Sequence, residues 1–185
     1  MASGEWRVEK VFSSISLLHY LTNMKQRINI LLTAAFMAIG LVACDSGRVL
    51  YSEYISVGEE YEWAADEPIR FDVEVTENKH AYELALAVRV GSGYPYDKLL
   101  LHVTEQSPSG ESIRRDVEVP VRNAKGEFYG DKGFDLIDIE YILDASKEFP
   151  VFGRYSYTVE PAMPEIDPVV YVVELGMILR DIPVK

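Results

Sequence analysis

The segment Ile69–Val75, IRFDVEV, alternates apolar and charged side chains without a break. Successive side chains of a β-strand point to opposite faces, so this alternation predicts a strand with one buried face. The segment 82–90, YELALAVRV, repeats the pattern, with apolar residues again at every second position. Only a short polar stretch, ENKH (77–80), separates the two, and we expect the two strands to pair as a hairpin.

Two segments further along the chain predict strands at different places in a sheet. Residues 98–104 are apolar on almost both faces, which indicates an interior strand. The turn that follows, Ser107–Gly110, contains a proline and a glycine, both of which favour turns. Residues 113–121 alternate again, but Pro120 lacks an N–H and would remove a ladder hydrogen bond. This segment is therefore expected at a sheet edge.

The C-terminal third continues the β pattern, with one ambiguous segment. Residues 153–160 predict a strand, and residues 169–179 predict a final buried strand in which Gly176 marks a bulge. The apolar residues of 135–143 fit one face of a helix, so a short helix or an irregular segment is expected there. Roughly seven strands separated by turns predict an all-β fold, an antiparallel β-sandwich or jelly roll.

Upstream of these strands lies MKQRINILLTAAFMAIGLVAC, residues 24–44, which has the features of an export signal. Lys25 and Arg27 form a positive head, and the fourteen-residue run 30–43 that follows is mostly apolar. That run is shorter than the roughly 20 residues that a membrane-spanning helix needs. We therefore expect a signal-peptide helix, although a short membrane anchor or a buried helix is the alternative.

The end of this signal, Leu41, Val42, Ala43 and Cys44, resembles a bacterial lipobox. The resemblance implies cleavage before Cys44 and a covalent diacylglyceryl and N-acyl (palmitate-type) lipid on that cysteine. The expected organisation is a signal peptide over 1–43, a lipidated tether over 44–60 and a β-sandwich domain over 61–185. Residues 1–23 are interpreted as a misassigned upstream extension, with Met24 as the true start.

Composition narrows the function classes. Residues 1–43 contain two of the 30 acidic and four of the 18 basic residues. The part from Cys44 onward therefore has 28 acidic and 14 basic residues, a net charge of −14. Proteins that bind nucleic acids use Lys and Arg to displace counterions, so no nucleic-acid partner is expected. The same balance leaves the lipid as the means of attachment to a membrane. Cys44 is the only cysteine, so packing must hold the domain together without a disulfide.

Candidate chemical sites are few. His80 and His102 have no partner at metal-ligand spacing, and no metal site is expected. The acidic residues of 131–140 lack the order of a calcium loop and are interpreted as a solvated face. No hydrolase, metalloprotease or phosphate-binding motif occurs. We therefore expect no catalytic residues and no cofactor beyond the lipid on Cys44.

The loop 91–96 contains the candidate binding residues Tyr94, Pro95 and Tyr96. Two tyrosines around a proline offer a stiff, amphipathic recognition surface, so we expect this loop to bind a partner. Core packing is the alternative for both rings, as it is for Trp63, which could otherwise form part of an exposed sugar platform.

The order and spacing of many residues resemble the gliding-motility lipoprotein family GldH of the Bacteroidota. Lys98 and Pro164 depart from the family pattern, which has asparagine and arginine there. The residues that carry the resemblance are Trp63, Ile69-Arg70-Phe71, Tyr82-Glu83-Leu84, Arg89, Tyr94-Pro95-Tyr96, Leu99, Gly126, Gly130, Asp135, Gly153-Arg154-Tyr155, Glu160-Pro161-Ala162-Met163 and Gly176.

This resemblance implies a lipid-anchored accessory or scaffold protein of the cell envelope, linked to gliding and to the type IX secretion machinery. It carries over no catalytic residues, so a non-enzymatic role is expected. The expected location is the outer membrane, and the expected partners are the membrane, through the lipid, and other envelope or gliding-machinery proteins. The alternative is a surface glycan-binding lipoprotein; a small envelope hydrolase is the third option.

Replacement of Cys44 by alanine tests the lipobox prediction. The Cys44→Ala chain should remain an uncleaved, unlipidated precursor because the acylated residue is absent, and it should move to the soluble fraction. Intact-mass measurement of the wild-type chain from membranes should show the loss of residues before Cys44 and the added lipid. An unmodified Cys44 in the wild-type chain would contradict the prediction.

Overall fold

The computed structural model describes residues 47–58, 60–76 and 81–182, which form strands joined by turns and loops. Within these ranges, no helix is long and apolar enough to cross a bilayer. The all-β prediction is confirmed. The expected signal-peptide helix, the lipobox and the polar turn 77–80 lie outside the described residues.

One layer is a five-stranded antiparallel sheet with the strand order β1-β11-β4-β8-β7. Its strands are β1 (Val49–Ser56), β4 (Tyr82–Gly91), β7 (Asp131–Lys132), β8 (Leu136–Lys147) and β11 (Val172–Asp181). Except for β7 and β8, which follow one another along the chain, neighbours in this order are far apart in sequence, so most of the sheet is assembled from non-local pairings.

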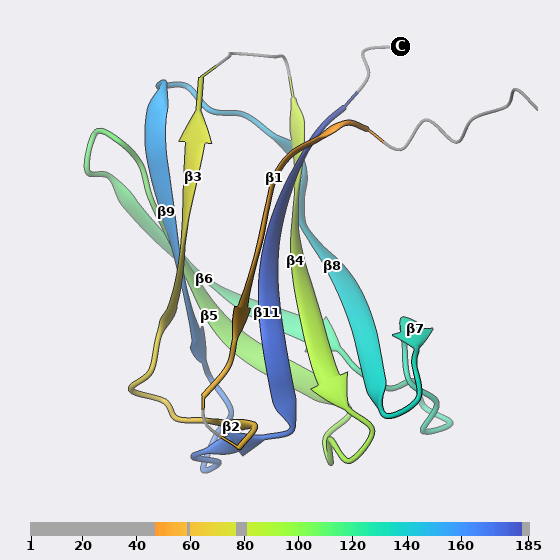
Figure 1. Ribbon diagram of the computed structural model, residues 1–185. Coiled ribbons are helices and arrows are strands. Elements are labelled where there is room, and N and C mark those ends of the chain that lie inside the picture. The colour runs from red at the N-terminus through yellow and green to blue at the C-terminus, as the bar shows by residue number, and fades with distance from the viewer. Residues whose placement is uncertain (1–46, 59, 77–80, 183–185) are drawn as a thin grey trace, which may run out of the picture. The chain divides into compact units, whose positions relative to one another are not determined.

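The other layer is a four-stranded antiparallel sheet with the order β3-β9-β5-β6. It contains β3 (Ile69–Val75), β5 (Lys98–Gln106), β6 (Ser112–Pro120) and β9 (Gly153–Pro161). A two-stranded ribbon joins β2 (Glu62–Trp63) to β10 (Val169–Val170). Figure 1 shows the two larger sheets as separate layers, the arrangement of a β-sandwich.

The core fills the space between the layers with the inward-facing side chains of both sheets. The alternating apolar residues of β3 and β4 are all buried, as the sequence predicts. Trp63 is fully buried as well, and its indole Nε1–H donates to the carbonyl of Glu67 at 2.7 Å. Each fully buried large apolar side chain contributes about 1.5–3 kcal/mol to folding, so this shared core holds the two sheets together.

Two predictions about strand position are confirmed. β5 lies between β9 and β6 in the interior of its sheet, as its two apolar faces indicate. β6 is at the edge of that sheet, with Pro120 at its exposed end. The turn between them is closed by the N–H of Gly110, which donates to Ser107 at 2.9 Å while Gly110 adopts a φ of +88°.

The predicted hairpin between residues 69–75 and 82–90 is wrong. β3 pairs with β9, whereas β4 pairs with β11 and β8 in the opposite sheet. The alternation of a strand determines which face is buried, and both layers of a sandwich bury one face. The pattern therefore locates both strands but does not show that the chain crosses from one layer to the other between them.

The prediction of a helix or irregular segment at 135–143 is also wrong, because residues 136–143 lie in β8. Ile137 and Ile139 alternate toward the core, while Leu136 and Ile142 are on the outer face and exposed. Apolar residues on both faces imitate the spacing of a helix, since positions three and four apart are then also apolar.

The stretch 44–60, predicted as a tether, contains a strand of the domain. β1 pairs with β11 along residues 49–56 and forms an edge of the five-stranded sheet. Most of its side chains are exposed, so the apolar alternation that identifies a strand is weak. Backbone hydrogen bonds to β11 hold it in place, and these leave no mark on the sequence.

The final predicted strand, 169–179, is divided in two. Tyr171, with a φ of +63°, separates β10 from β11. The irregularity in the pairing with β4 lies between Val172 and Glu174, so the bulge predicted at Gly176 is misplaced. Gly176 pairs regularly with Tyr54 on one side and Ala87 on the other.

An ion pair connects the two layers near one end of the core. Lys147 on β8 places its Nζ 2.6 Å from Oε1 and 2.8 Å from Oε2 of Glu105 on β5. Their side chains are only 15% and 13% exposed, so both charges are largely removed from water. Loss of one member of such a pair leaves the other buried and uncompensated.

Replacement of Lys147 by methionine should therefore lower the free energy of unfolding by about 3–5 kcal/mol, measured by urea denaturation. The matched control is Lys98→Met, because Lys98 pairs with Glu118 at 2.8 Å but both side chains are more than half exposed. That control should cost less than about 1 kcal/mol. An equal decrease in the free energy of unfolding in the two variants would show that the inter-layer pair stabilises the domain no more than the exposed pair does.

Candidate functional site

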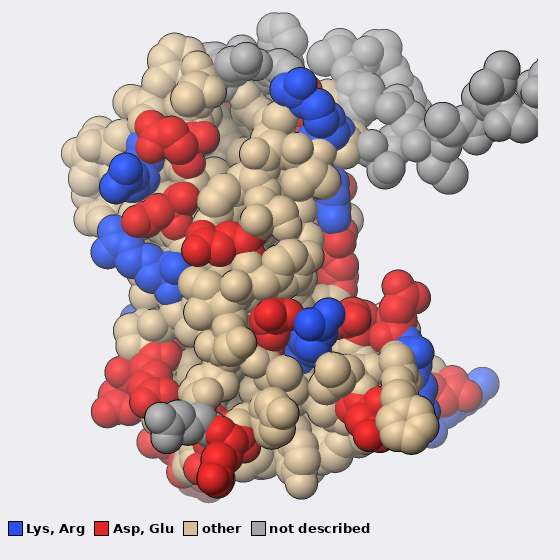
Figure 2. All heavy atoms as spheres, in the orientation of Figure 1, with Lys and Arg blue, Asp and Glu red and all other residues tan. Residues whose placement is uncertain are grey.

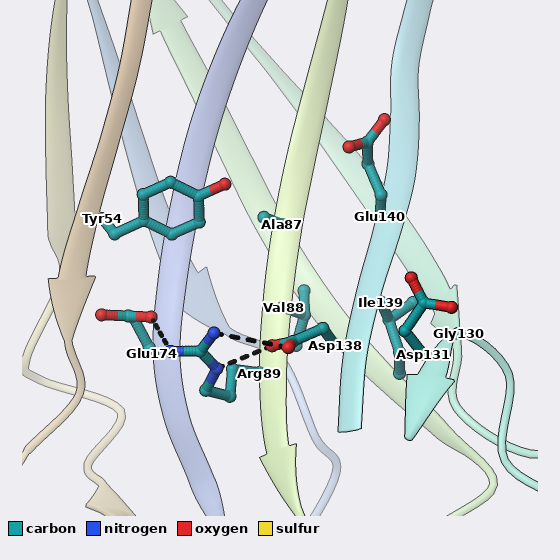
Figure 3. Close-up of a pocket in the computed structure, with 10 residues that line it drawn as sticks. All are labelled: Tyr54, Ala87, Val88, Arg89, Gly130, Asp131, Asp138, Ile139, Glu140 and Glu174. Carbon is teal, nitrogen blue, oxygen red and sulfur yellow. Dashed lines mark hydrogen bonds and ion pairs between the residues drawn. The ribbon is translucent and has the colours of Figure 1, made fainter. Parts of the chain in front are cut away.

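The outer face of the five-stranded sheet contains a hollow of about 670 Å³ (Figure 3). Strands β1, β11, β4 and β8 form its floor and sides, and the segment 130–131 contributes from beside β8. Figure 2 shows a basic group flanked by acidic side chains on the same face. The lining residues are Tyr54, Ala87, Val88, Arg89, Gly130, Asp131, Asp138, Ile139, Glu140 and Glu174.

In one row of residues across the sheet, an aromatic ring packs against a glycine. The strand register aligns Tyr54, Gly176, Ala87 and Glu140 side by side. A Cβ at Gly176 would lie 2.5 Å from both Cδ1 and Cε1 of Tyr54, so the ring rests directly on the glycine. Tyr54 is nevertheless 50% exposed. In Figure 3 the ring lies over β11 with a face turned outward and its hydroxyl directed toward the hollow.

The next row forms a charged wall. Here the register aligns Glu174, Arg89, Asp138 and Asp131. The guanidinium of Arg89 donates from Nη1 to Glu174 at 2.7 Å, and from Nε and Nη2 to Asp138 at 2.6 and 3.3 Å. The hydrogen bond to Asp138 raises the pKa of Arg89 above its ordinary value. Three of its five N–H groups are used, so two remain for a ligand.

A second arginine fixes the far side of the hollow. Arg180 donates from Nη1 and Nη2 to the two carboxylate oxygens of Glu140, both at 2.6 Å, and from Nη1 to Glu83 at 2.9 Å. The bond to Glu140 raises the pKa of Arg180 further above its usual range. A bidentate pair of this kind fixes the orientation of the carboxylate as well as its charge.

The electrostatic balance of the hollow is acidic. Its lining contains four carboxylates and one guanidinium, a net charge of −3. Asp131 has no ion pair among the described residues. The site therefore offers hydrogen-bond acceptors, a smaller number of fixed donors and an aromatic face, all on rigid strands.

The predicted binding loop lies elsewhere. Tyr94 is fully buried, and its hydroxyl donates to the carbonyl of Lys98 at 3.0 Å. Burial raises the pKa of Tyr94 well above its usual value. Tyr96 packs edge-on against it with ring centroids 5.4 Å apart, and Pro95 is exposed. The core-packing alternative thus describes Tyr94, while partner binding by this loop stays a prediction.

The remaining residues that the sequence analysis considered lie outside the described part of the chain or have a structural role. Cys44, Leu41, Val42, Ala43 and His80 lie outside the described residues. His102 places Nδ1 2.6 Å from Oδ1 of Asp116 on the neighbouring strand, and Trp63 belongs to the core. In the part of the chain that the structure describes, no group of three or more His, Cys, Asp or Glu side chains could hold a metal ion.

Sequence analysis missed Tyr54, Arg89 and Gly176 as site residues. Three carboxylates of the hollow, Asp131, Asp138 and Glu140, lie in the acidic segment that was interpreted as a solvated face. A signal was present in β4, whose outward face has the small residues Ala85 and Ala87 immediately before the large charged Arg89. The site itself depends on register between distant strands, which no local pattern contains.

Fold and hollow together define a small antiparallel β-sandwich domain with an open polar site on one sheet face. The model of the GldH lipoprotein family matches residues 49–179, from the start of β1 almost to the end of β11. The chain therefore belongs to the GldH lipoprotein family. It is 30% identical over 136 residues to a protein of Flavobacterium johnsoniae named gliding motility lipoprotein GldH, covering 74% of this chain and 80% of that one.

Two solved structures show weaker similarity. A family GH115 4-O-methyl-α-glucuronidase is 12% identical with a TM-score of 0.38, covering 74% of this chain and 18% of the enzyme. TmCBM61, solved with β-1,4-galactotriose, is 10% identical with a TM-score of 0.31, covering 74% of this chain and 90% of that one. Both scores are low, so neither similarity bears on function.

Alanine substitutions at Tyr94 and Tyr96 separate packing from binding. Tyr94→Ala should lower the free energy of unfolding by about 3–5 kcal/mol because it empties a fully enclosed position. Tyr96→Ala should cost less, since its ring is only partly enclosed. Urea denaturation measures both, with the exposed Tyr129→Ala as control. A Tyr94→Ala chain as stable as the control would contradict this placement, and partner loss in a stable Tyr96→Ala chain would support the binding loop.

Proposed function

We propose that the protein is a lipid-anchored, non-enzymatic accessory or scaffold component of a cell-envelope assembly that serves gliding and type IX secretion. The observation that carries the proposal is the family match over 49–179, which spans nearly the whole described domain. The similar protein of Flavobacterium johnsoniae bears the name of a gliding motility lipoprotein. We place the assembly at the outer membrane.

The proposed anchor is a lipid on Cys44, with the membrane as its partner. β1 begins at Val49, five residues after that cysteine. An extended chain spans at most about 3.3–3.6 Å per residue, so the lipidated cysteine and the first strand would be separated by no more than about 18 Å. A lipidated chain of this design keeps its domain close to the bilayer, where other envelope proteins are assembled.

The chemistry of the hollow supports binding rather than catalysis. Of the four carboxylates that line the hollow, Asp138, Glu174 and Glu140 are each engaged by an arginine. A catalytic acid or base must be able to exchange a proton with a bound substrate. Carboxylates whose oxygens are held in charge-assisted hydrogen bonds are better suited to fix a neighbouring guanidinium or to accept bonds from a ligand.

Crosslinking in native cells tests the proposed role. Chemical crosslinking of the wild-type lipoprotein, followed by purification and mass spectrometry, should enrich proteins of the gliding or type IX secretion machinery. The control is Cys44→Ala, which should lose that enrichment because it is no longer held at the membrane.

Deletion of the gene provides an independent measurement. Export of type IX substrates should fall in the deletion strain and recover with the wild-type gene but not with Cys44→Ala. Normal export together with no enrichment of machinery proteins would refute the proposed scaffold role.

A further inference from the structure

We propose that the hollow over Tyr54 is a binding site for an uncharged sugar residue of a glycan. The inference stands on the geometry of the outer sheet face and holds whether or not the chain acts in gliding. Three observations carry it: the seating of the Tyr54 ring, the mixture of hydrogen-bonding groups around it and the charge of the lining.

The ring of Tyr54 forms a flat platform. Gly176 has no side chain, so the ring lies against the backbone of β11, where a Cβ would come within 2.5 Å of two ring carbons. Ala87, the next residue in the row, contributes only a methyl group. The outer face of the ring stays open to solvent (Figure 3). An open aromatic face attracts the weakly positive C–H groups on one side of a pyranose ring.

The groups around the platform match the hydroxyls of a sugar. A hydroxyl both donates and accepts hydrogen bonds, so its site needs acceptors and donors together. The carboxylates of Asp131 and Glu140 supply acceptors, and Arg89 retains two N–H donors beyond its ion pairs. The hydroxyl of Tyr54 can serve in either way.

These groups are held in place before a ligand arrives. Arg89 is fixed by Asp138 and Glu174, and Glu140 is fixed by Arg180, all on paired strands. A site whose side chains are already ordered loses little conformational entropy on binding, which benefits weakly binding ligands such as sugars. The volume of about 670 Å³ also lies within the range of pockets that take small ligands.

The charge of the site selects among ligands of similar shape. A lining with a net charge of −3 opposes uronic acids and other anionic sugars. A cationic side chain could use the carboxylates, but it would approach the fixed positive charge of Arg89 and leave that donor unused. An uncharged, polyhydroxylated ligand uses acceptors, donors and the aromatic face at once.

Binding to immobilised oligosaccharides tests the proposal. The probe set comprises uncharged gluco-, galacto-, manno- and xylo-configured oligosaccharides, uronate-containing oligosaccharides and oligolysine. The full lipoprotein is applied in a zwitterionic detergent, because a maltoside would itself present sugar to the site. We expect saturable binding to at least one uncharged class and no retention on the uronate probes.

Three variants assign that binding to the hollow. Tyr54→Ala removes the platform, and Gly176→Ala adds a Cβ that displaces the ring; each should weaken binding by about tenfold or more. The matched control is Tyr171→Ala, which removes a tyrosine of similar exposure, 47% against 50%, outside the hollow and should bind as the wild type does. Thermal melting of each variant confirms that the domain is folded.

Each contrary result overturns the proposal. The proposal is wrong if the protein binds none of the uncharged oligosaccharides. It is also wrong if the protein binds only the uronate probes or only oligolysine. Uncharged binding that persists unchanged in both Tyr54→Ala and Gly176→Ala would place the sugar elsewhere. If Tyr54→Ala alone fails to fold, Gly176→Ala and Arg89→Lys, which keeps the charge but loses the planar fork, decide the outcome.

Discussion

The structure depends on the burial of two sheet faces against each other. The only cysteine of the chain is Cys44, so no disulfide can join the layers, and the inward-facing side chains must supply the cohesion. Large residues such as Trp63, Phe71 and Tyr157 are completely enclosed between the sheets. Burial raises the pKa of Tyr157 far above its usual value, which keeps its phenol neutral within this core. Because strands such as β3, β4 and β5 each commit one face to this core, function is left to the opposite faces and to the loops.

The sequence predicts this layer well and the pairing of its strands poorly. β3, β4, β6 and β9 follow from alternation, since a buried face must repeat every second residue, and β5 follows from its run of apolar residues. The partner of a strand depends on how the chain crosses between layers, and alternation contains no information about that path. The two long strands that the sequence misses fail for opposite reasons: β8 is apolar on both faces, and β1 is exposed on most of its length.

The candidate site lies beyond sequence prediction for the same physical reason. Its aromatic row joins residues 54, 87, 140 and 176, which meet only through the register of four strands. Tyr94 and Tyr54 illustrate the difference between what the local sequence suggests and where the fold places a side chain. Tyr94, flanked by a proline and close to two glycines, looks like a recognition residue but points into the core. Tyr54 looks like part of a tether but is held flat on the sheet by a glycine more than a hundred residues away.

Glycine has the same structural use at a second place in the domain. A Cβ at Gly93 would lie 2.9 Å from Cε1 and Cζ of Tyr171, so that ring too rests where a side chain is absent. A tyrosine seated on glycine buries one face while the other stays exposed, which gives a flat apolar surface without an aggregation-prone protrusion. Tyr171 does not line the hollow, whereas two arginine-centred networks border Tyr54 there. The difference between a packed surface tyrosine and a binding platform therefore lies in the neighbouring strands. Gly176, Arg89 and Glu140 must occur in register for the exposed ring of Tyr54 to become a site.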